Sequence, residues 1–195
     1  MNEKGPLPGP DGILRCPWGL SAADYVAYHD EEWGVPVRDD AGLYERLCLE
    51  AFQSGLSWLT ILRKRENFRA AFDGFAPEKV AAYGERDVER LMADAGIVRN
   101  RRKVDAAIAN ARATLDLADG PDGGLAALAW RYADPDAPVP VLFSDVPATT
   151  PGSVALAKEL KRNGIRFVGP TTVYALMQAC GLVNDHLRGC FRRDR

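Results

Sequence analysis

Hydrophobic residues recur at helical spacing along most of this chain, and the clearest stretch begins near residue 40. Asp39 and Asp40 open it, and both are good helix N-caps. The next residues of interest lie on one face of a helix, at offsets of 0, 4, 7, 8 and 11. They are Leu43, Leu47, Glu50, Ala51 and Ser54. The pattern therefore predicts a helix with one buried face, and it places an acid, Glu50, on that face.

The rest of the pattern predicts further helices and no convincing alternating strand. After an interruption at Gly55, an apolar helix is expected at 56–62, ending in a basic group, and others at 78–82, 85–94, about 100–117, 153–160 and 173–179. Ser153 is the expected N-cap of the helix at 153–160. Turn residues over 119–124 and five prolines over 133–151 predict irregular connections. The predicted fold class is all-α.

Length and composition predict one globular domain. The chain has 195 residues, of which 47% are hydrophobic and 27% charged, both ordinary globular values. Residues 1–14 contain three prolines and three glycines with little to bury, so we expect a mobile arm ahead of a domain over 15–195. No stretch has the apolar length of a membrane span, and the N-terminus lacks the hydrophobic core of a signal peptide. We expect a cytoplasmic monomer without membrane contact.

Basic residues are segregated although the formal net charge is −2. One cluster covers 63–69, and another opens the helix expected at 100–117. Gly96 to Val98 form a short hairpin before that second cluster, so we expect a helix-hairpin-helix in which Gly96 supplies a positive φ. The helix start would bind DNA phosphates without reading sequence, with contacts from Gly96, Arg99, Arg101, Arg102 and Lys103. An ordinary αα-hairpin with solvated basic faces is the alternative.

The two histidines of the chain each stand at short spacing from a cysteine. Cys16 precedes His29 by 13 positions, and His186 precedes Cys190 by four. Four Cys and His ligands are typical of a closed, structural zinc site, since a catalytic zinc keeps one position for water. Such a site would join the two ends of the chain, although a histidine is more often a core or surface residue than a ligand. The other cysteines, Cys48 and Cys180, lie in apolar runs and are expected to be buried thiols.

Several strings of residues resemble the 3-methyladenine DNA glycosylase I family, in the same order and spacing over nearly the whole chain. They are Tyr25-x2-Tyr28-His29-Asp30, Glu32-Trp33-Gly34-Val35-Pro36, Leu49-Glu50 with Gly55-Leu56-Ser57-Trp58, Asp94-Ala95-Gly96-Ile97-Val98-Arg99, and Met177-Gln178-Ala179-Cys180-Gly181-Leu182-Val183-Asn184-Asp185-His186.

The resemblance implies a helix-hairpin-helix glycosylase that flips a damaged nucleotide out of double-stranded DNA and hydrolyses its N-glycosidic bond. It also implies a structural Zn²⁺ ion, one per chain, held by Cys16, His29, His186 and Cys190. The family's base pocket maps onto Tyr25, Tyr28, Glu50 and Trp58. The aspartate that most of the superfamily uses in catalysis is lacking in this family.

The chemistry of the pocket residues agrees with this assignment. Methylation at N3 makes adenine cationic, so its bond to deoxyribose is already weak. Trp58 can stack on such a base, Glu50 can accept its hydrogen bonds, and the two tyrosines can supply hydroxyls or a second wall. Glu50 is the expected catalytic residue, and a role in base recognition alone is the alternative. No lysine stands out as a Schiff-base nucleophile, so we expect no lyase activity.

Other interpretations of the same residues stay open at this stage. Trp58 and the tyrosines suit a hydrophobic core, and Glu50 suits a buried ion pair with an arginine. A non-catalytic protein that binds alkylated bases would use the same pocket, and a zinc hydrolase is a third possibility. The four-ligand count argues against an open catalytic metal.

Overall fold

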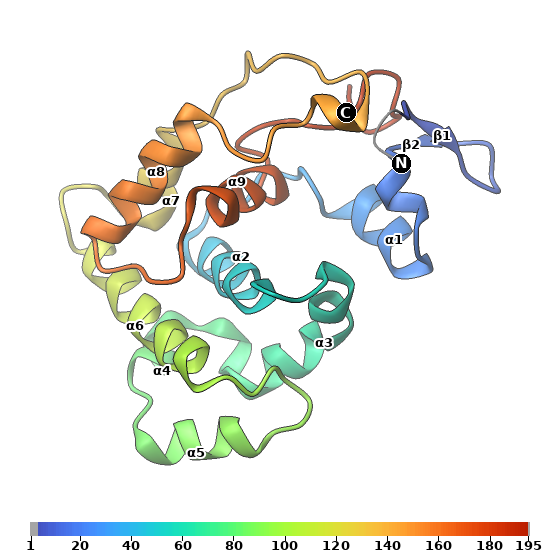
Figure 1. Ribbon diagram of the computed structural model, residues 1–195. Coiled ribbons are helices and arrows are strands. Elements are labelled where there is room, and N and C mark those ends of the chain that lie inside the picture. Colours follow the sequence, from blue (N-terminus) through green and yellow to red (C-terminus); the bar gives the residue numbers. More distant parts are fainter. Residues whose placement is uncertain (1–3, 195) are drawn as a thin grey trace.

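The computed structural model describes residues 4–194, and helices account for most of its regular structure (Figure 1). The α-helices are α1 (Ala23–Glu31), α2 (Asp40–Gln53), α3 (Trp58–Ala71), α4 (Pro77–Ala81), α5 (Glu85–Ala93), α6 (Arg101–Ala118), α7 (Leu125–Trp130), α8 (Pro151–Arg162) and α9 (Pro170–Ala179). Short 3-10 turns are η1 (Pro17–Leu20), η2 (Asp73–Phe75) and η3 (Phe143–Asp145), and two strands, β1 (Leu7–Pro8) and β2 (Leu14–Arg15), pair antiparallel.

Helix α2 lies at the centre of the fold, with α3, α6, α7 and α9 packed around it (Figure 1). The predicted cap is confirmed, because the Asp39 carboxylate accepts a hydrogen bond from Gly42 N at 2.7 Å. Leu43 and Leu47 are buried as the periodicity predicted, and Glu50 is buried beside them. An aromatic cluster from α2, α3 and η2 fills the core below, made of Phe52, Phe68, Phe72 and Phe75.

Helix α6 is the second long element of the core, and it packs along α4 and α5. Its N-cap is Asn100, whose side chain accepts from Lys103 N at 3.3 Å. The predicted range of about 100–117 is therefore confirmed to within one residue. The predicted helices at 78–82, 85–94 and 173–179 correspond to α4, α5 and α9 with small shifts at their ends.

Several helix boundaries differ from the predictions for local reasons. Helix α3 continues through the basic cluster to Ala71, because Phe68 and Ala71 extend its buried face beyond residue 62. Thr150, and not Ser153, caps α8: the two side chains bond each other's backbone in a capping box, with Ser153 at the third helical position. Helices α1 and α7, over 23–31 and 125–130, were not predicted.

The two ends of the chain lie close together (Figure 1). Strand β1 pairs with β2 through Leu7 and Arg15, so part of the expected mobile arm is ordered as a ribbon; residues 1–3 lie outside the described residues. Phe191 N donates to Leu14 O at 3.0 Å, which ties the C-terminal segment to this ribbon. The connection over 131–150 also runs past both ends. Within residues 4–194, no helix has the length and apolar character that a membrane span requires.

Candidate functional site

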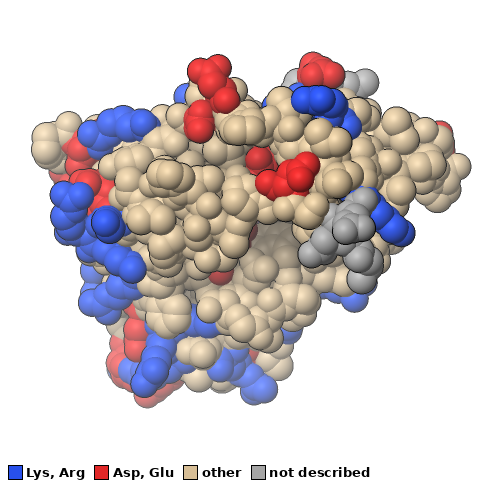
Figure 2. Space-filling model, turned by 45° about the horizontal axis from the view of Figure 1, so that its top comes forward, with Lys and Arg blue, Asp and Glu red and all other residues tan. Residues whose placement is uncertain are grey.

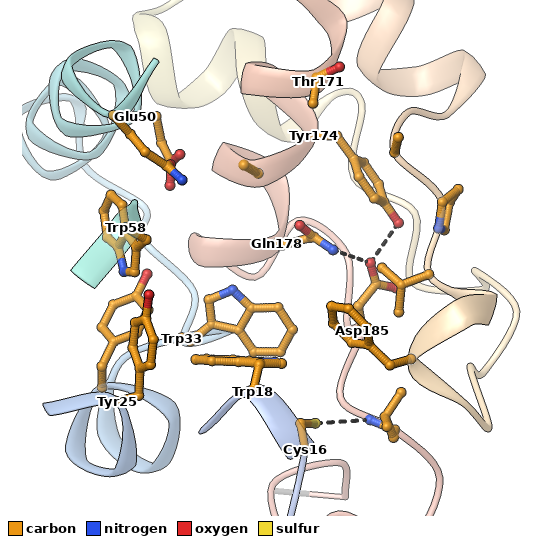
Figure 3. Close-up of a pocket in the computed structure, with 18 of the residues that line it drawn as sticks. Cys16, Trp18, Tyr25, Trp33, Glu50, Trp58, Thr171, Tyr174, Gln178 and Asp185 are labelled. Carbon is orange, nitrogen blue, oxygen red and sulfur yellow. Dashed lines mark hydrogen bonds between the residues drawn. The ribbon is translucent and has the colours of Figure 1, made fainter. Parts of the chain in front are cut away.

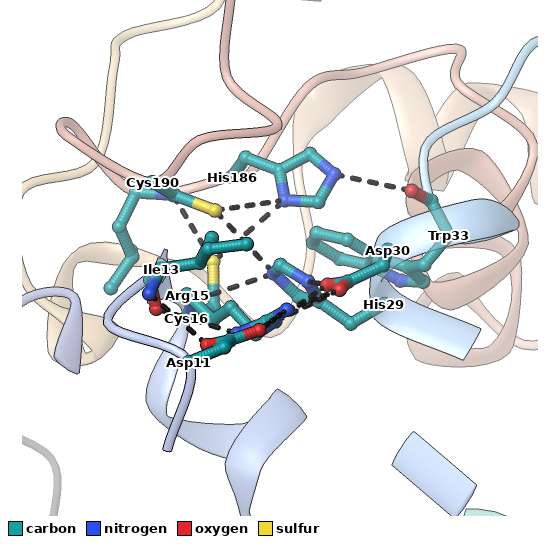
Figure 4. Close-up of polar contacts among 10 residues, drawn as sticks. Asp11, Ile13, Arg15, Cys16, His29, Asp30, Trp33, His186 and Cys190 are labelled. Carbon is teal, nitrogen blue, oxygen red and sulfur yellow. Dashed lines mark hydrogen bonds and ion pairs between the residues drawn. The ribbon is translucent and has the colours of Figure 1, made fainter. Parts of the chain in front are cut away.

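Cys16, His29, His186 and Cys190 come together in one buried cluster where the ends of the chain meet (Figure 4). Cys16 precedes η1, His29 lies in the last turn of α1, and the other two flank a tight turn after α9. The Cys190 sulfur lies 3.5 Å from His29 Nε2 and 3.7 Å from His186 Nδ1, and the Cys16 sulfur lies 3.8 Å from His186 Nδ1. The predicted ligand set is thus assembled, and all four ligand atoms lie within 4.8 Å of one another.

These separations suit a tetrahedral metal ion. With zinc–nitrogen and zinc–sulfur bonds of about 2.0 to 2.3 Å, the edges of a tetrahedron are about 3.3 to 3.8 Å. No disulfide joins the cysteines of this cluster, and both sulfurs are free to act as ligands. Leu187 N also donates to the Cys16 sulfur at 3.4 Å, as suits a thiolate.

The outer nitrogen of each histidine ring is held by a separate acceptor (Figure 4). His29 Nδ1 lies 2.8 Å from the Asp30 carboxylate, and His186 Nε2 lies 3.1 Å from the Trp33 carbonyl oxygen. This arrangement makes each outer nitrogen the donor and leaves the lone pair of the inner nitrogen directed at the cluster, as in metal-bound histidine. Arg15 holds Asp30 in turn at 2.7 Å, and its hydrogen bonds, with that of His29, lower the pKa of the Asp30 carboxyl despite burial.

Two glycines allow the histidine rings to approach the backbone. A Cβ atom at Gly19 would lie 2.9 Å from the His29 ring, and one at Gly34 would lie 3.1 Å from His186 Nε2. Gly34 also has a φ of 82°, a left-handed conformation that favours glycine. The residues around the cluster therefore fit a bound metal ion in packing as well as in donor type.

A cavity of about 520 Å³ opens next to the cluster, and this face of the molecule is visibly hollowed (Figure 2). Its walls come from α1, α2, α3, α9 and the segment 143–148. Cys16 lies at the border of the two sites, since it belongs to the cluster and also lines the cavity. The four predicted pocket residues, Tyr25, Tyr28, Glu50 and Trp58, all line the cavity. Tyr25, Glu50 and Trp58 lie on one side of it (Figure 3).

Aromatic rings make up much of the cavity wall. The Tyr28 and Trp58 rings lie 5.5 Å apart, while Trp18 packs edge-on to Tyr25 at 5.7 Å and to Trp33 at 5.0 Å. Trp58 packs partly against the core, as the alternative interpretation suggested, but its indole Nε1 is buried and has no hydrogen-bond partner among residues 4–194. A buried donor without a partner is costly and is typical of a site that awaits a ligand.

Glu50 is the charged side chain on the aromatic side of the cavity. It is 6% exposed, and its carboxyl group has no hydrogen bond or ion pair in the described part of the chain. Arg46, one helical turn earlier, pairs instead with Glu32 at 3.0 Å, so the buried Arg–Glu pair considered from the sequence does not form. Burial raises the pKa of the Glu50 carboxyl to about 8, although the charge of Arg46 opposes this shift.

Not all of the predicted DNA-contact residues have a charged group that is available to bind a phosphate. Helices α5 and α6 are joined by residues 94–100, and Arg99 and Arg102 are exposed with no ion pair among the described residues. Arg101 is also exposed but pairs with Glu85 at 2.7 Å. Lys103 differs most, because its ammonium group is buried and donates to Phe52 O at 2.8 Å and Ser54 O at 2.6 Å. It caps the C-terminal end of α2 and is not available to a phosphate.

The expected positive φ at Gly96 is wrong. Gly96 is not among the described residues with positive φ, and its N–H donates to the Asp94 carboxylate at 2.7 Å. Glycine is needed there for another reason: an added Cβ would lie 2.9 Å from Asp94 Oδ1 and 3.2 Å from the Asn67 side chain. Lys64 Nζ, also on α3, binds the carbonyl oxygens of Ala95 and Gly96 at 3.0 and 3.1 Å. Close packing against α3 therefore sets the shape of this turn.

Several lining residues had no role in the sequence interpretation. Trp18 and Trp33 complete the aromatic wall, and Asp185 lies on the opposite side with Tyr174 and Gln178 (Figure 3). Sequence spacing does not reveal them, because they come from η1, the segment after α1, α9 and the segment that follows it. Trp33, Gln178 and Asp185 stand in the strings that resemble the family, and Asp185 is also an acid next to a predicted metal ligand, but none of them was assigned a role.

Comparisons with known proteins agree with this geometry. The methyladenine glycosylase family model matches residues 18–193. DNA-3-methyladenine glycosylase 1 of Escherichia coli strain K12 is 49% identical over 178 residues, covering 90% of this chain and 95% of that protein. A crystal structure of a 3-methyladenine DNA glycosylase I superposes with a TM-score of 0.88 at 48% identity, covering 92% of this chain and 99% of the other.

A second solved structure, of the enzyme from Staphylococcus aureus, concerns 3-methyladenine recognition. It superposes with a TM-score of 0.87 at 35% identity and covers 93% of this chain and 97% of its own. Family match, identity and fold agree over nearly the whole length. The chain belongs to the methyladenine glycosylase family.

Proposed function

We propose that this protein excises 3-methyladenine from alkylated double-stranded DNA by flipping the damaged nucleotide and hydrolysing its N-glycosidic bond. One observation carries the proposal: the buried carboxyl group of Glu50, which has no partner among residues 4–194, faces a cavity walled by aromatic rings. The names of the relatives point to the same substrate. We further propose that the enzyme works as a cytoplasmic monomer.

The empty pocket and the bound pocket differ in the charge that Glu50 carries. With its pKa raised to about 8 by burial, Glu50 is mostly protonated at neutral pH before substrate binds. A cationic base placed against it favours the carboxylate, because an opposite charge lowers the pKa of an acid. A neutral adenine does not supply that charge. The pocket thereby selects an alkylated, cationic base over an undamaged one.

The aromatic side chains hold the base in place. Trp58 and Tyr28 offer faces for stacking and cation–π contact, each contributing on the order of 1 kcal/mol or more. Their separation of 5.5 Å shows that the two rings share one side of the cavity. Tyr25 adds a hydroxyl group to the same side of the cavity (Figure 3). Since the cationic base is already a good leaving group, recognition and exclusion of water account for much of the chemistry.

We propose that the Cys/His cluster holds one structural Zn²⁺ ion. Cys16, His29, His186 and Cys190 supply the four ligands, and four protein ligands leave no position for a catalytic water. The metal supplies cross-linking of the chain ends. Because Cys16 and His29 lie before α2 while the other two ligands follow α9, a bound ion would link the N-terminal and C-terminal segments of the domain.

We propose that DNA is bound by a helix-hairpin-helix formed by α5, residues 94–100 and α6. Arg99 and Arg102 are the exposed cations that contact phosphates. Gly96 acts through the shape of the turn, and Arg101 acts only if its exposed pair with Glu85 opens. We expect no lyase activity, because none of the described residues that line the cavity is a lysine.

Release of free base from methylated DNA tests the proposed function. Purified protein is incubated with DNA treated with a methylating agent, and free 3-methyladenine and strand breaks are measured separately. We expect release of 3-methyladenine without strand breaks. Binding of methylated DNA with no release would instead support the alternative, a non-catalytic alkylated-base binding protein. Loss of release on chelation without unfolding would contradict a purely structural metal.

A further inference from the structure

A second acid, Asp185, lies across the cavity from Glu50. Glu50, Trp58 and Tyr25 occupy one side, and Asp185 with Tyr174 and Gln178 occupies the other, with Trp18 and Trp33 between them (Figure 3). Asp185 is 5% exposed, so it is about as buried as Glu50. The cavity therefore presents two carboxyl groups on facing walls.

The contacts of Asp185 use only one of its two oxygens. Oδ2 accepts from Tyr174 Oη at 2.6 Å and from Gln178 Nε2 at 2.7 Å. Oδ1 has no hydrogen-bond partner among residues 4–194, and it is not one of the fully enclosed side-chain atoms without a partner. Two donors to one oxygen hold the carboxyl group in one orientation, and the residue as a whole lines the cavity.

The cavity has room for more than a base. A volume of about 520 Å³ lies in the range of pockets that enclose a whole drug-sized ligand, which matches a nucleoside better than a purine alone. The aromatic rings and Glu50 account for the base. With the base against Glu50, the facing wall that is left for the deoxyribose of the same nucleotide is the one that carries Asp185 (Figure 3).

We propose that Asp185 is a catalytic residue on the sugar side of the cavity, where its free carboxylate oxygen stabilises the positive charge that develops on deoxyribose. This inference rests on the proposed glycosylase function. In the reaction, the bond between C1′ and N9 breaks and its electron pair goes to the cationic base, which leaves as neutral 3-methyladenine. The sugar becomes an oxocarbenium ion, water adds to C1′, and the water's proton is lost to solvent. A fixed carboxylate near C1′ favours this transition state.

Tyr174 and Gln178 are positioning residues in this arrangement. Both lie on α9, one turn apart, and both donate to the same oxygen of Asp185. Their hydrogen bonds fix the orientation of the carboxyl group. A purely structural role for Asp185, in which it only fastens α9 to the segment of the metal cluster, is the alternative that the experiment must exclude.

Asp185→Asn tests the proposal, with Tyr174→Phe as the matched control. The first removes the charge and keeps the shape, whereas the second removes one hydrogen bond and keeps the charge. We expect single-turnover release of 3-methyladenine to fall roughly 100-fold in Asp185→Asn and only a few-fold in Tyr174→Phe. Zinc content and melting temperature identify folded protein. Equal losses in the two folded variants would show a structural role and overturn the proposal.

Binding to two abasic analogues separates the sugar side from the base side. DNA that carries a cationic pyrrolidine in place of the sugar mimics the oxocarbenium charge, and DNA with a tetrahydrofuran is its neutral partner. We expect the wild-type protein and Glu50→Gln to prefer the pyrrolidine at least tenfold, and Asp185→Asn to lose most of that preference. No preference in the wild-type protein would overturn the proposal even if Asp185→Asn failed to fold.

The two proposals fail in different ways. A wild-type protein that releases no 3-methyladenine contradicts the proposed function, and the role of Asp185 falls with it. A wild-type protein that releases the base while Asp185→Asn keeps full turnover and full pyrrolidine preference contradicts only the role of Asp185.

Discussion

The Cys/His cluster and the cavity lie side by side, share Cys16, and differ in how completely their polar groups are satisfied. In the cluster, every histidine nitrogen has a sulfur, carboxylate or carbonyl neighbour within 3.8 Å. In the cavity, Glu50 has no partner in the described residues, and Trp58 Nε1 is buried without an acceptor. The histidine nitrogens of the cluster all have polar neighbours, whereas two buried polar groups of the cavity need a ligand to complete their contacts.

This difference teaches how each site contributes to the protein. A buried group whose partners are all present adds to the free energy of folding, whereas a buried group without a partner costs folding free energy and is compensated when a ligand binds. Substitutions in the cluster should therefore lower stability first and activity as a consequence. Substitutions of the unpaired cavity group Glu50 should lower activity and leave stability unchanged or raise it.

Removal of a cluster ligand should have the largest effect. Cys190→Ser and His186→Ala are expected to lose the metal and about 3 kcal/mol or more of unfolding free energy, because structural zinc binding contributes directly to folding. Metal content and denaturant unfolding measure this. Cys180→Ala is the matched control, since Cys180 is equally buried but lies outside the cluster. A similar loss of unfolding free energy in Cys180→Ala would mean that the cysteines stabilise the protein by packing and not by metal binding.

Glu50→Gln should lower activity but raise stability, whereas a substitution in the cluster lowers both. We expect at least a tenfold loss of 3-methyladenine release together with higher stability than wild type at pH 8. The folded pKa, about 8, lies above the usual value near 4.5, so the folded state binds the proton more tightly and wild-type stability falls as pH rises between these values. The gain in the variant is on the order of a few kcal/mol.

Denaturant unfolding of both proteins from pH 5 to pH 9 measures the Glu50 effect. Glu45→Gln on the same helix is the control, because Glu45 pairs with Arg69 at 2.8 Å and its loss should destabilise the protein. A stability difference between Glu50→Gln and wild type that does not change with pH would show that Glu50 is not the titrating group.

Asp30→Asn should have an intermediate effect on the protein, because it should weaken metal binding without removing a ligand. Asp30 orients His29 at 2.8 Å and is itself held by Arg15. Loss of such a partner typically weakens metal binding by about 10- to 100-fold. Competition with a chromophoric chelator measures the affinity. Unchanged zinc affinity would show that the His29 ring is held by packing alone, against Gly19 and Trp18.

Arg99→Ala and Arg102→Ala should have the smallest effects, confined to DNA affinity. Each is expected to weaken binding uniformly across sequences and to reduce the salt dependence of binding by about one unit of slope. Lys103→Met is the control, because that buried lysine serves the end of α2 and should affect stability without changing the salt slope. A reduced salt slope in Lys103→Met and an unchanged slope in Arg102→Ala would contradict our assignment. It would mean that Lys103 contacts phosphate and Arg102 does not.

Local patterns predicted much of the fold because they act within one helix. The caps at Asp39 and Asn100 and the buried phase of α2 follow from short-range hydrogen bonds and helical periodicity. Helix α1 was missed because its residues alternate between the cluster, the cavity and solvent and show no single apolar face. The error at Gly96 has a partly similar cause, since an added Cβ would meet Asn67 on another helix as well as Asp94 in the turn itself.

The sequence by itself determined the helical class, the pairing of each histidine with a cysteine, and the presence of an acid on a buried helix face. It could not decide which cations are free, because the partner of Lys103 lies 49 and 51 positions away at the end of another helix. It also could not place Asp185 opposite Glu50. Those facts depend on contacts between distant segments, and such contacts form only when packing of the helices brings the segments together.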